Sequence, residues 1–340
     1  MKKKLKWPYI QLSRTDHEQK TLKEQMTECC VAFIDVLGFK NMVLNDIDSV
    51  ILALRYIETF CDSFFKFPSR RTGSKTYPLN NAPEYNYNYS RTDDDMDDEY
   101  EMNKPVVTMF SDSIVISQTI DDFFDISEFV EFTSKMQYHL LIEGILIRGG
   151  ISIGNLYHSD RYIFGNGMIS AYKIESEKAV YPRIVIDKNV MERCTEIIDK
   201  KFNQSYNAHI LYEGKKYYQI PYKDYSDYEY SLYIQLDLDG LYYINYLQDN
   251  LNIIEASSKD LLDTDIYILK STYEDYCIKI IKLVDEGIRM DDIRVQEKYR
   301  WLKNKYNRAI NIYLNSYSQL FSDTKEKSDF FITWDKLYIK

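Results

Sequence analysis

Between residues 30 and 186, short apolar runs alternate with segments whose apolar residues recur at helical spacing, and this alternation constrains the fold more than any other feature. Apolar runs of about four to eight residues are typical of strands, and a period of about 3.6 residues is typical of helices. The pattern predicts the order strand, helix, strand, strand, helix, strand, short strand, helix, strand. The expected strands are 30–35, 106–110, 114–116, 145–153, 156–157 and 183–186, with a turn at Gly154-Asn155.

This order predicts an α+β sandwich with a ferredoxin-like βαββαβ core, in which an antiparallel or mixed sheet carries helices on one face. Asp46 or Asp48 is expected to cap the first helix. Further along, Asp239-Gly240 lies between two apolar runs and is a strong hairpin signal. Two long helices are predicted after it, at roughly 258–286 and 291–316. They look like packing or dimerisation helices, without chemistry of their own.

Three parts of the chain follow: an N-terminal arm at 1–28, a core domain at 29–190 and a C-terminal extension at 191–340. Residues 66–104 interrupt the core with three prolines, tyrosine–asparagine alternation and the acidic run 93–101. We expect an exposed and partly disordered insertion there, because long polar loops usually lack fixed structure. An acidic run can also bind a cation.

Composition narrows the classes of function. The formal net charge of −10 argues against broad nucleic-acid binding, which needs a basic surface. The five cysteines have no metal-ligand spacing, and a reducing cytoplasm fits them best. No apolar stretch approaches the ~20 residues of a membrane-spanning helix. The four histidines share no ligand spacing, and no P-loop or G-x-S-x-G motif is present.

Two aspartates stand out because of where they lie. Asp35 ends an apolar strand, where an unpaired carboxylate is costly to bury, and Asp112 occupies the tip of the expected hairpin. In a βαββαβ sheet the first strand lies beside that hairpin, so the two carboxylates converge. Each aspartate alone has a simpler explanation as a turn residue. The pair favours a site for Mg²⁺, which prefers oxygen ligands and retains waters or substrate phosphates.

Several residues near this pair are candidates for binding phosphate. Gly38-Phe39-Lys40 opens a helix, where glycine lets a ligand approach the backbone and free N–H groups can meet an anion. Arg148 lies beside two glycines on a strand, which favours a functional position for its side chain. Arg183 is a weaker candidate, because the sequence Tyr-Pro-Arg before a strand is also typical of a turn.

Four segments in the correct order resemble motifs of class III adenylyl and guanylyl cyclases, over residues 30–187. Residues 33–39 (FIDVLGF) resemble the first metal motif of that family, and residues 110–113 (FSDS) resemble the second, which usually reads Gly-Asp. Residues 148–154 (RGGISIG) look like the R-x-G-I-x-x-G strand. Residues 164–165 (FG) with 171–175 (AYKIE) look like the helix that follows in the family.

The departures from that family are also informative. The transition-state asparagine of the family aligns with Ile169 and its arginine with Lys173, while its base-reading aspartate and lysine fall near Tyr162 and Thr108. A purine pocket is therefore not expected. With these changes the chain is similar to the pyrimidine cyclases of bacterial anti-phage (Pycsar) systems. Those enzymes convert UTP or CTP to the 3′,5′-cyclic monophosphate.

The resemblance implies a homodimer with composite active sites, to which the second subunit supplies cations. It implies that Asp35, Asp112 and the Val36 carbonyl hold two Mg²⁺ or Mn²⁺ ions, and that Arg148 and Lys173 neutralise charge in the transition state. Thr108 and Tyr162 are the candidates for contacting the base. The cyclic product would activate a separate effector without direct contact, and a phage-derived activator is a further candidate partner.

Two other hypotheses stay open. A palm-type enzyme that joins two nucleotides also carries two aspartates on such a sheet, but it prefers a Gly-Gly-Asp/Glu-Glu-Phe hairpin, which Phe-Ser-Asp-Ser lacks. A catalytically degenerate cyclase-like module that binds a nucleotide or a protein is favoured by Ile169 at the asparagine position. Retention of both metal aspartates opposes that hypothesis.

Overall fold

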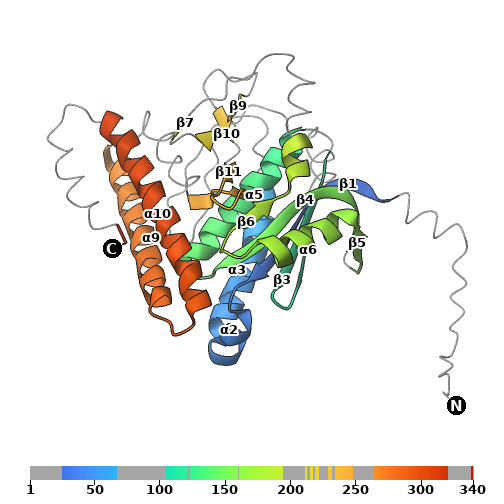
Figure 1. Ribbon diagram of the computed structural model, residues 1–340, viewed down its shortest axis with the longest axis horizontal. Helices are drawn as coiled ribbons and strands as arrows, with labels where there is room; N and C mark the ends of the chain where they lie inside the picture. Colours follow the sequence, from blue (N-terminus) through green and yellow to red (C-terminus); the bar gives the residue numbers. More distant parts are fainter. Residues whose placement is uncertain are drawn as a thin grey trace, which may run out of the picture.

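The computed structural model describes residues 25–66, 105–120, 123–159, 161–193, 234–247, 263–320 and 338–339, with four short strands between 211 and 231. The expected insertion at 66–104 and most of the N-terminal arm lie outside these ranges. The chain forms an open mixed sheet with helices (Figure 1). Its elements are β1 (Thr27–Val36), α2 (Phe39–Asn45), α3 (Ile47–Lys66), β2 (Val106–Phe110), β3 (Ser113–Thr119), α5 (Phe123–Ile142), β4 (Ile147–His158), β5 (Ile163–Gly165), α6 (Asn166–Lys178), β6 (Ile184–Ile186), β7 (Leu211–Tyr212), β8 (Lys215–Lys216), β9 (Gln219–Pro221), β10 (Glu229–Ser231), β11 (Ile234–Leu236), β12 (Tyr242–Ile244), α9 (Asp263–Ile288) and α10 (Ile293–Leu320).

The strands of the main sheet follow the order β11-β12-β6-β4-β1-β3-β2, and β5 pairs with β4. β1 lies between β3 and β4 and is antiparallel to both, whereas β4 and β6 are parallel. Strand β1, helices α2 and α3, hairpin β2–β3, helix α5 and strand β4 therefore make the expected βαββαβ core. The arrangement confirms the predicted α+β fold class.

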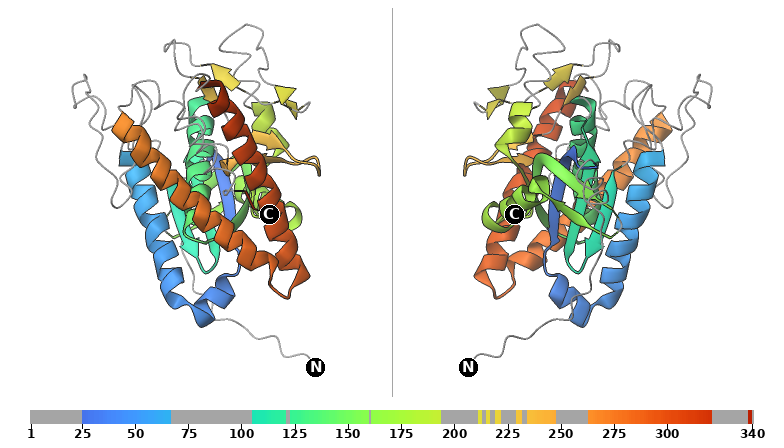
Figure 2. Two further views of the ribbon diagram at one scale, coloured as in Figure 1. Left: turned by 90° about the vertical axis from the view of Figure 1, so that its left-hand side faces the viewer. Right: turned by 90° about the vertical axis from the view of Figure 1, so that its right-hand side faces the viewer.

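The two faces of the sheet are covered differently (Figure 2). Ala32 and Ile34 of β1 point into the main core, which α3, α5, α9 and α10 complete. Val31 and Phe33 point to the opposite face, where Ala171 of α6 meets them. The prediction that the helices cover one face of the sheet is therefore confirmed for α3 and α5 of the βαββαβ core. It is wrong for α6, which covers part of the other face.

Glycines let α6 approach this second face closely. A Cβ atom on Gly150 would lie 2.5 Å from the carbonyl oxygen of Ala171, and one on Gly154 would lie 2.8 Å from the nitrogen of Gly167. The turn expected at Gly154-Asn155 is wrong, because β4 continues through it and Gly154 pairs with Cys29 of β1. Gly154 instead allows α6 to pack closely against the strand, and in the sequence a glycine with this role looks the same as a glycine in a turn.

The C-terminal third contributes to the same sheet. The expected hairpin is confirmed: β11 and β12 are antiparallel, and Gly240 has the positive φ of 82° that its turn requires. β12 pairs with β6 and so extends the main sheet. The two expected long helices are α9 and α10, which pack on one another. Asp46 caps α3, since its Oδ1 accepts from the Ser49 nitrogen at 3.2 Å.

Of the helices in the ranges described, none combines the length and apolarity needed to cross a membrane.

Candidate active site

The two aspartates predicted to converge lie at one end of β1. Asp35 pairs across the β1–β3 ladder with Ser113, the residue that follows Asp112. The Val36 nitrogen donates to the Asp112 carbonyl at 2.9 Å, which ties the hairpin turn to the end of β1. Ser111 precedes Asp112 in the left-handed region, with φ of 57°. Backbone pairing therefore brings together two carboxylates that are 77 positions apart (112 − 35).

Arg148 lies directly opposite Asp35 in the β1–β4 ladder and contacts three groups. Its Nε donates to Asp35 Oδ2 at 3.1 Å, and its Nη1 donates to the Ala179 carbonyl at 3.2 Å. Its Nη2 lies 2.8 Å from Glu175 Oε1 of α6 in an ion pair. The planar guanidinium has donors in a fixed fork, so these three contacts fix its position at the end of the sheet.

The electrostatics of this cluster disfavour negative charge. Burial raises the pKa of Asp35, Arg148 lowers it, and the charge of Asp112 raises it again, so that the net pKa is above its ordinary value. Burial also raises the pKa of Glu175, against the opposing effect of Arg148 and with the added repulsion of Asp35 and Asp112. Two of the three carboxylates, Asp35 and Glu175, contact the one guanidinium, and Asp112 adds a further negative charge, so an additional cation would relieve their repulsion.

This donor set suits a divalent metal. Asp35 and Asp112 offer hard carboxylate oxygens at one sheet edge, the Val36 carbonyl is a further oxygen there, and their repulsion would fall on binding Mg²⁺ or Mn²⁺. Within the described ranges, no group of three or more His, Cys, Asp or Glu side chains is arranged to hold a metal by itself. The two aspartates would therefore need waters and substrate phosphates to complete the coordination, as magnesium sites usually do.

The predicted phosphate-binding turn lies directly after these residues. Gly38 has φ of 79°, which lets the chain leave β1 and enter α2. The Leu37 nitrogen donates to the Leu146 carbonyl at 2.8 Å, so the turn is anchored beside β4. Phe39 packs partly against the core, and Lys40 is exposed. Gly38, Phe39 and Lys40 thus border the aspartate pair.

One candidate for contacting the base lies on the same face as Asp35. Thr108 pairs with Val115, which pairs with Phe33, so all three share the α6 face of the sheet with Asp35. The Thr108 hydroxyl lies 2.9 Å from His158 Nε2, and the Ser117 hydroxyl lies 2.7 Å from Nδ1 of the same ring. His158 escaped sequence reasoning because its partners are 41 and 50 residues away.

The other candidates are not brought to Asp35 within this chain. Tyr162, just before β5, is 56% exposed. Lys173 is exposed, and Ile169 is 57% exposed; at 100° a residue, both lie on the side of α6 away from buried Ala171 and Glu175. Side chains in this position are directed away from the cluster around Arg148 and toward the exterior.

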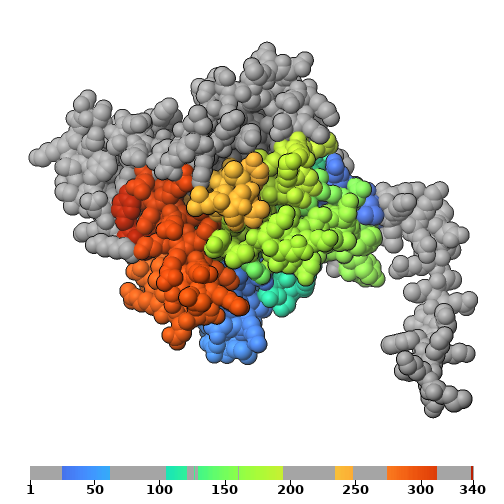
Figure 3. All heavy atoms as spheres, viewed as in Figure 1, coloured from blue at the N-terminus to red at the C-terminus, as the bar shows by residue number. Residues whose placement is uncertain are grey.

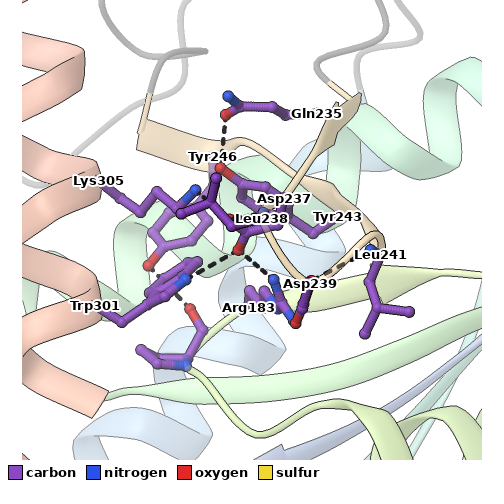
Figure 4. Close-up of polar contacts among 11 residues, drawn as sticks. Arg183, Gln235, Asp237, Leu238, Asp239, Leu241, Tyr243, Tyr246, Trp301 and Lys305 are labelled. Carbon is purple, nitrogen blue, oxygen red and sulfur yellow. Dashed lines mark hydrogen bonds and ion pairs between the residues drawn. The ribbon is translucent and has the colours of Figure 1, made fainter. Parts of the chain in front are cut away.

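Arg183 is not a phosphate ligand. Its side chain is fully buried and forms ion pairs with Asp237 and Asp239 of the β11–β12 hairpin. Asp237 also accepts from Trp301 Nε1 at 3.0 Å and from Lys305 Nζ at 2.7 Å, both from α10 (Figure 4). These five residues, named here the hairpin clip, join β6, the hairpin and α10. The sequence did not predict these contacts of Trp301 and Lys305, because their acceptor Asp237 lies in a separate hairpin about 64 residues earlier in the chain.

A further cation, Lys298 of α10, lies near enough to the cluster to interact with its charges. Its side chain is half-buried, and the charges of Arg148 and Asp35 both act on it. On one face of the molecule the surfaces of α10, α6, the β2–β3 hairpin and α2 meet (Figure 3). Sequence reasoning did not single out Lys298, because nothing in the sequence places residue 298 near residue 35.

Comparison with known proteins gives little beyond this geometry. No protein-family model matches the chain, and no curated protein matches it. It resembles the crystal structure of the guanylyl cyclase Cya2, at 11% identity and a TM-score of 0.33, over 65% of this chain and 92% of that chain. It also resembles a bacterial light-regulated adenylyl cyclase, at 13% identity and a TM-score of 0.28, over 68% and 58% of the two chains. These TM-scores are too low to support an argument about function.

Proposed function

We propose that the chain is a nucleotidyl cyclase that converts UTP or CTP to the 3′,5′-cyclic monophosphate and pyrophosphate. The observation that supports it most is the convergence of Asp35, Asp112 and Arg148 at the end of β1, in segments that resemble the cyclase motifs. Two carboxylates suited to a divalent metal, beside a fixed guanidinium, are what in-line transfer of a nucleotidyl group needs. In the resembled anti-phage systems, the product acts as a second messenger for a separate effector.

The chemistry can be assigned to groups of this chain. The ribose 3′-hydroxyl loses its proton to water, its oxygen attacks the α-phosphorus, the bond from that phosphorus to the bridging oxygen breaks, and pyrophosphate leaves with the electron pair. Asp35, Asp112 and the Val36 carbonyl would hold Mg²⁺ or Mn²⁺, which when bound acidifies the 3′-hydroxyl and neutralises phosphate charge. Arg148 stabilises charge on the α-phosphate oxygens, and Glu175 and the Ala179 carbonyl keep its guanidinium in place.

Preference for a pyrimidine is supported by the base-contact position. Thr108 stands where the resembled purine cyclases carry lysine, and its hydroxyl is held by His158. A hydroxyl supported in this way can donate to or accept from the Watson–Crick edge of uracil or cytosine. Tyr162 is the second proposed base contact, contributed from the exposed segment before β5 to the neighbouring subunit's site.

A homodimer is supported by the apolar surface around the site. Phe33 is in ring contact with Phe110 and Tyr172, and those two rings are 48% and 51% exposed. Ile169 continues this exposed apolar surface on α6. Exposed apolar patches commonly mark interaction sites. A second copy of the chain that covers this face would also bring its Lys173 to the first copy's cluster.

Product mass spectrometry tests the proposal. The purified chain is incubated separately with ATP, GTP, CTP and UTP, each with Mg²⁺ and with Mn²⁺, and we expect a cyclic mononucleotide from one pyrimidine triphosphate. Asp35→Asn and Asp112→Asn are each expected to abolish turnover while the melting temperature is kept. Full activity in both variants contradicts the assignment, and a dinucleotide product would favour a palm-type enzyme.

A degenerate module that binds nucleotide without turnover is the second candidate. It is favoured by the Asp35–Arg148 hydrogen bond, which already occupies one oxygen of the proposed metal ligand. Metal-dependent binding of UTP or CTP, without any product from a folded dimer and with phage extract present as a source of activator, would support this candidate.

A further inference from the structure

The N-terminal half of α10 is held against the end of the sheet that carries Arg148. The rings of Trp301 and Tyr181 stack with centroids 5.5 Å apart and planes 6° apart. Tyr181 is two residues beyond Ala179, whose carbonyl accepts from Arg148. Lys298 precedes Trp301 by three residues and therefore shares its face of the helix. This places the Lys298 ammonium on the side of α10 that faces the aspartate–arginine cluster.

Lys298 is unusual among the cations of this region because none of the described residues accepts a hydrogen bond from it. Its ammonium forms no hydrogen bond or ion pair within the part of the chain that the structure describes, although the side chain is half-buried. Arg148 has three partners, and Lys305, seven residues later on the same face, is bonded to Asp237. Partly burying an unpaired ammonium is unfavourable. Burial and the charge of Arg148 accordingly lower the pKa of Lys298, although Asp35 and Asp292 oppose this effect.

We propose that Lys298 binds the terminal phosphates of the nucleoside triphosphate, so that α10 supplies a phosphate-binding cation to the site of its own chain. The inference rests on the proposed function and names a further residue of the same site. A triphosphate beside Arg148 would give the ammonium the anionic acceptors that the described residues do not provide. The C-terminal extension is then part of the active site, and the hairpin clip fixes its position.

Inorganic tripolyphosphate is the probe that isolates this contact, because it carries neither base nor ribose. Its affinity is measured by calorimetry for the full-length chain, with and without Mg²⁺. We expect Lys298→Met to weaken binding about tenfold or more, the usual effect of losing a charge-assisted hydrogen bond, and Lys298→Arg to weaken it less than about threefold. Arg300→Ala is the matched control: this exposed cation of α10 donates to Gln296, and its loss is expected to leave affinity unchanged.

Stability separates binding from a structural role. Because its ammonium has no acceptor among the residues that the structure describes, we expect Lys298→Met to melt at or above the temperature of the unaltered chain, whereas loss of a structural cation would lower it. If Met does not fold, Lys298→Gln replaces it. With a cyclisable triphosphate, KM is expected to rise about tenfold, with kcat reduced less.

The outcomes separate the two proposals. Tripolyphosphate binding that depends on Lys298, in a chain that cyclises no nucleotide even with phage extract present, refutes the cyclase and keeps this inference. Cyclisation with unchanged affinity in Lys298→Met refutes this inference alone. Equal loss in Arg300→Ala, or no tripolyphosphate binding by the unaltered chain with or without Mg²⁺, also overturns it.

Discussion

Arg148 shows how one side chain can organise a site. Its guanidinium contacts Asp35, Glu175 and the Ala179 carbonyl through three separate nitrogens, whereas a lysine would have to reach all three acceptors from one nitrogen. For Arg148→Lys we expect kcat to fall about 10²–10³-fold, the usual effect of losing one charge-stabilising group. Initial rates of product formation measure it. Arg193→Lys, which alters an exposed pair with Glu28, is the control. Unaltered kcat in Arg148→Lys would contradict the role.

Ser111 carries a backbone penalty beside Asp112. Its φ of 57° is in the left-handed region, which costs a residue with a Cβ roughly 1–2 kcal/mol, and the resembled motif usually has glycine there. Ser111→Gly is expected to raise the free energy of unfolding by about 0.5–1 kcal/mol, since glycine removes this strain but loses more entropy. Urea denaturation measures the change. The control is Ser113→Gly, which lies in β3 and should lower the free energy of unfolding. A lower free energy of unfolding in Ser111→Gly would contradict the strain assigned to Ser111.

His139 gives the stability a dependence on pH. Burial, with a smaller contribution from Lys135, lowers its pKa to about 4, whereas an unfolded histidine titrates near 6.5. Between these values the unfolded chain binds more protons, so stability is full above about pH 6.5 and falls as the pH drops toward 4. Allowing for partial exposure, the loss is about 2 kcal/mol. Between pH 7 and pH 4.5, the urea midpoint of the unaltered chain should fall more steeply than that of His139→Phe. Equal dependence on pH in the two proteins would exclude the effect of His139.

At the scale of elements, the hairpin clip connects α10 to the site. Asp237 is buried and bonded to Arg183, Trp301 and Lys305, so removing its charge weakens the ion pairs of two largely buried cations. We expect Asp237→Asn to lower the free energy of unfolding by about 3 kcal/mol, in the range of broken buried ion pairs. The affinity for tripolyphosphate should also fall in Asp237→Asn, because Lys298 lies on α10, the helix that Asp237 holds in place.

Asp239→Asn is the matched variant for this experiment. Asp239 also pairs with Arg183, but its side chain is 41% exposed, so water can replace the lost partner. Urea midpoints and calorimetry on both variants show whether the effect follows burial. Equal destabilisation by the two substitutions would contradict the importance assigned to Asp237.

Sequence was sufficient where the determining signal is local. The apolar run around Ile34, the turn at Gly38 and the hairpin around Asp112 were predicted because alternation, glycine and turn residues act within a few positions. Glu175 in contact with Arg148, His158 between Thr108 and Ser117, and Lys298 near Asp35 could not be predicted. Each depends on packing between elements that are far apart in the chain, which no periodicity encodes.

At the scale of the whole molecule, the proposed dimer can be tested by complementation. Asp35→Asn removes a metal ligand, and Lys173→Ala removes the cation proposed to act on the partner's site. If the sites are composite, half of randomly formed dimers are mixed and each mixed dimer has one intact site, so co-expression should restore about a quarter of the activity. Product formation by each variant alone, and by the co-purified mixture, measures this. No gain on mixing would contradict a composite site.

The pairing of β12 with β6 has a consequence for dissecting this protein. If the chain were cut near residue 190, β6 would become a bare sheet edge with unpaired N–H and C=O groups, flanked by the fully buried side chains of Ile184 and Val185. Such edges recruit strands from other molecules. A fragment of residues 29–190 should therefore aggregate at concentrations where the full chain stays dispersed, and the minimal folding unit of this protein includes its C-terminal hairpin.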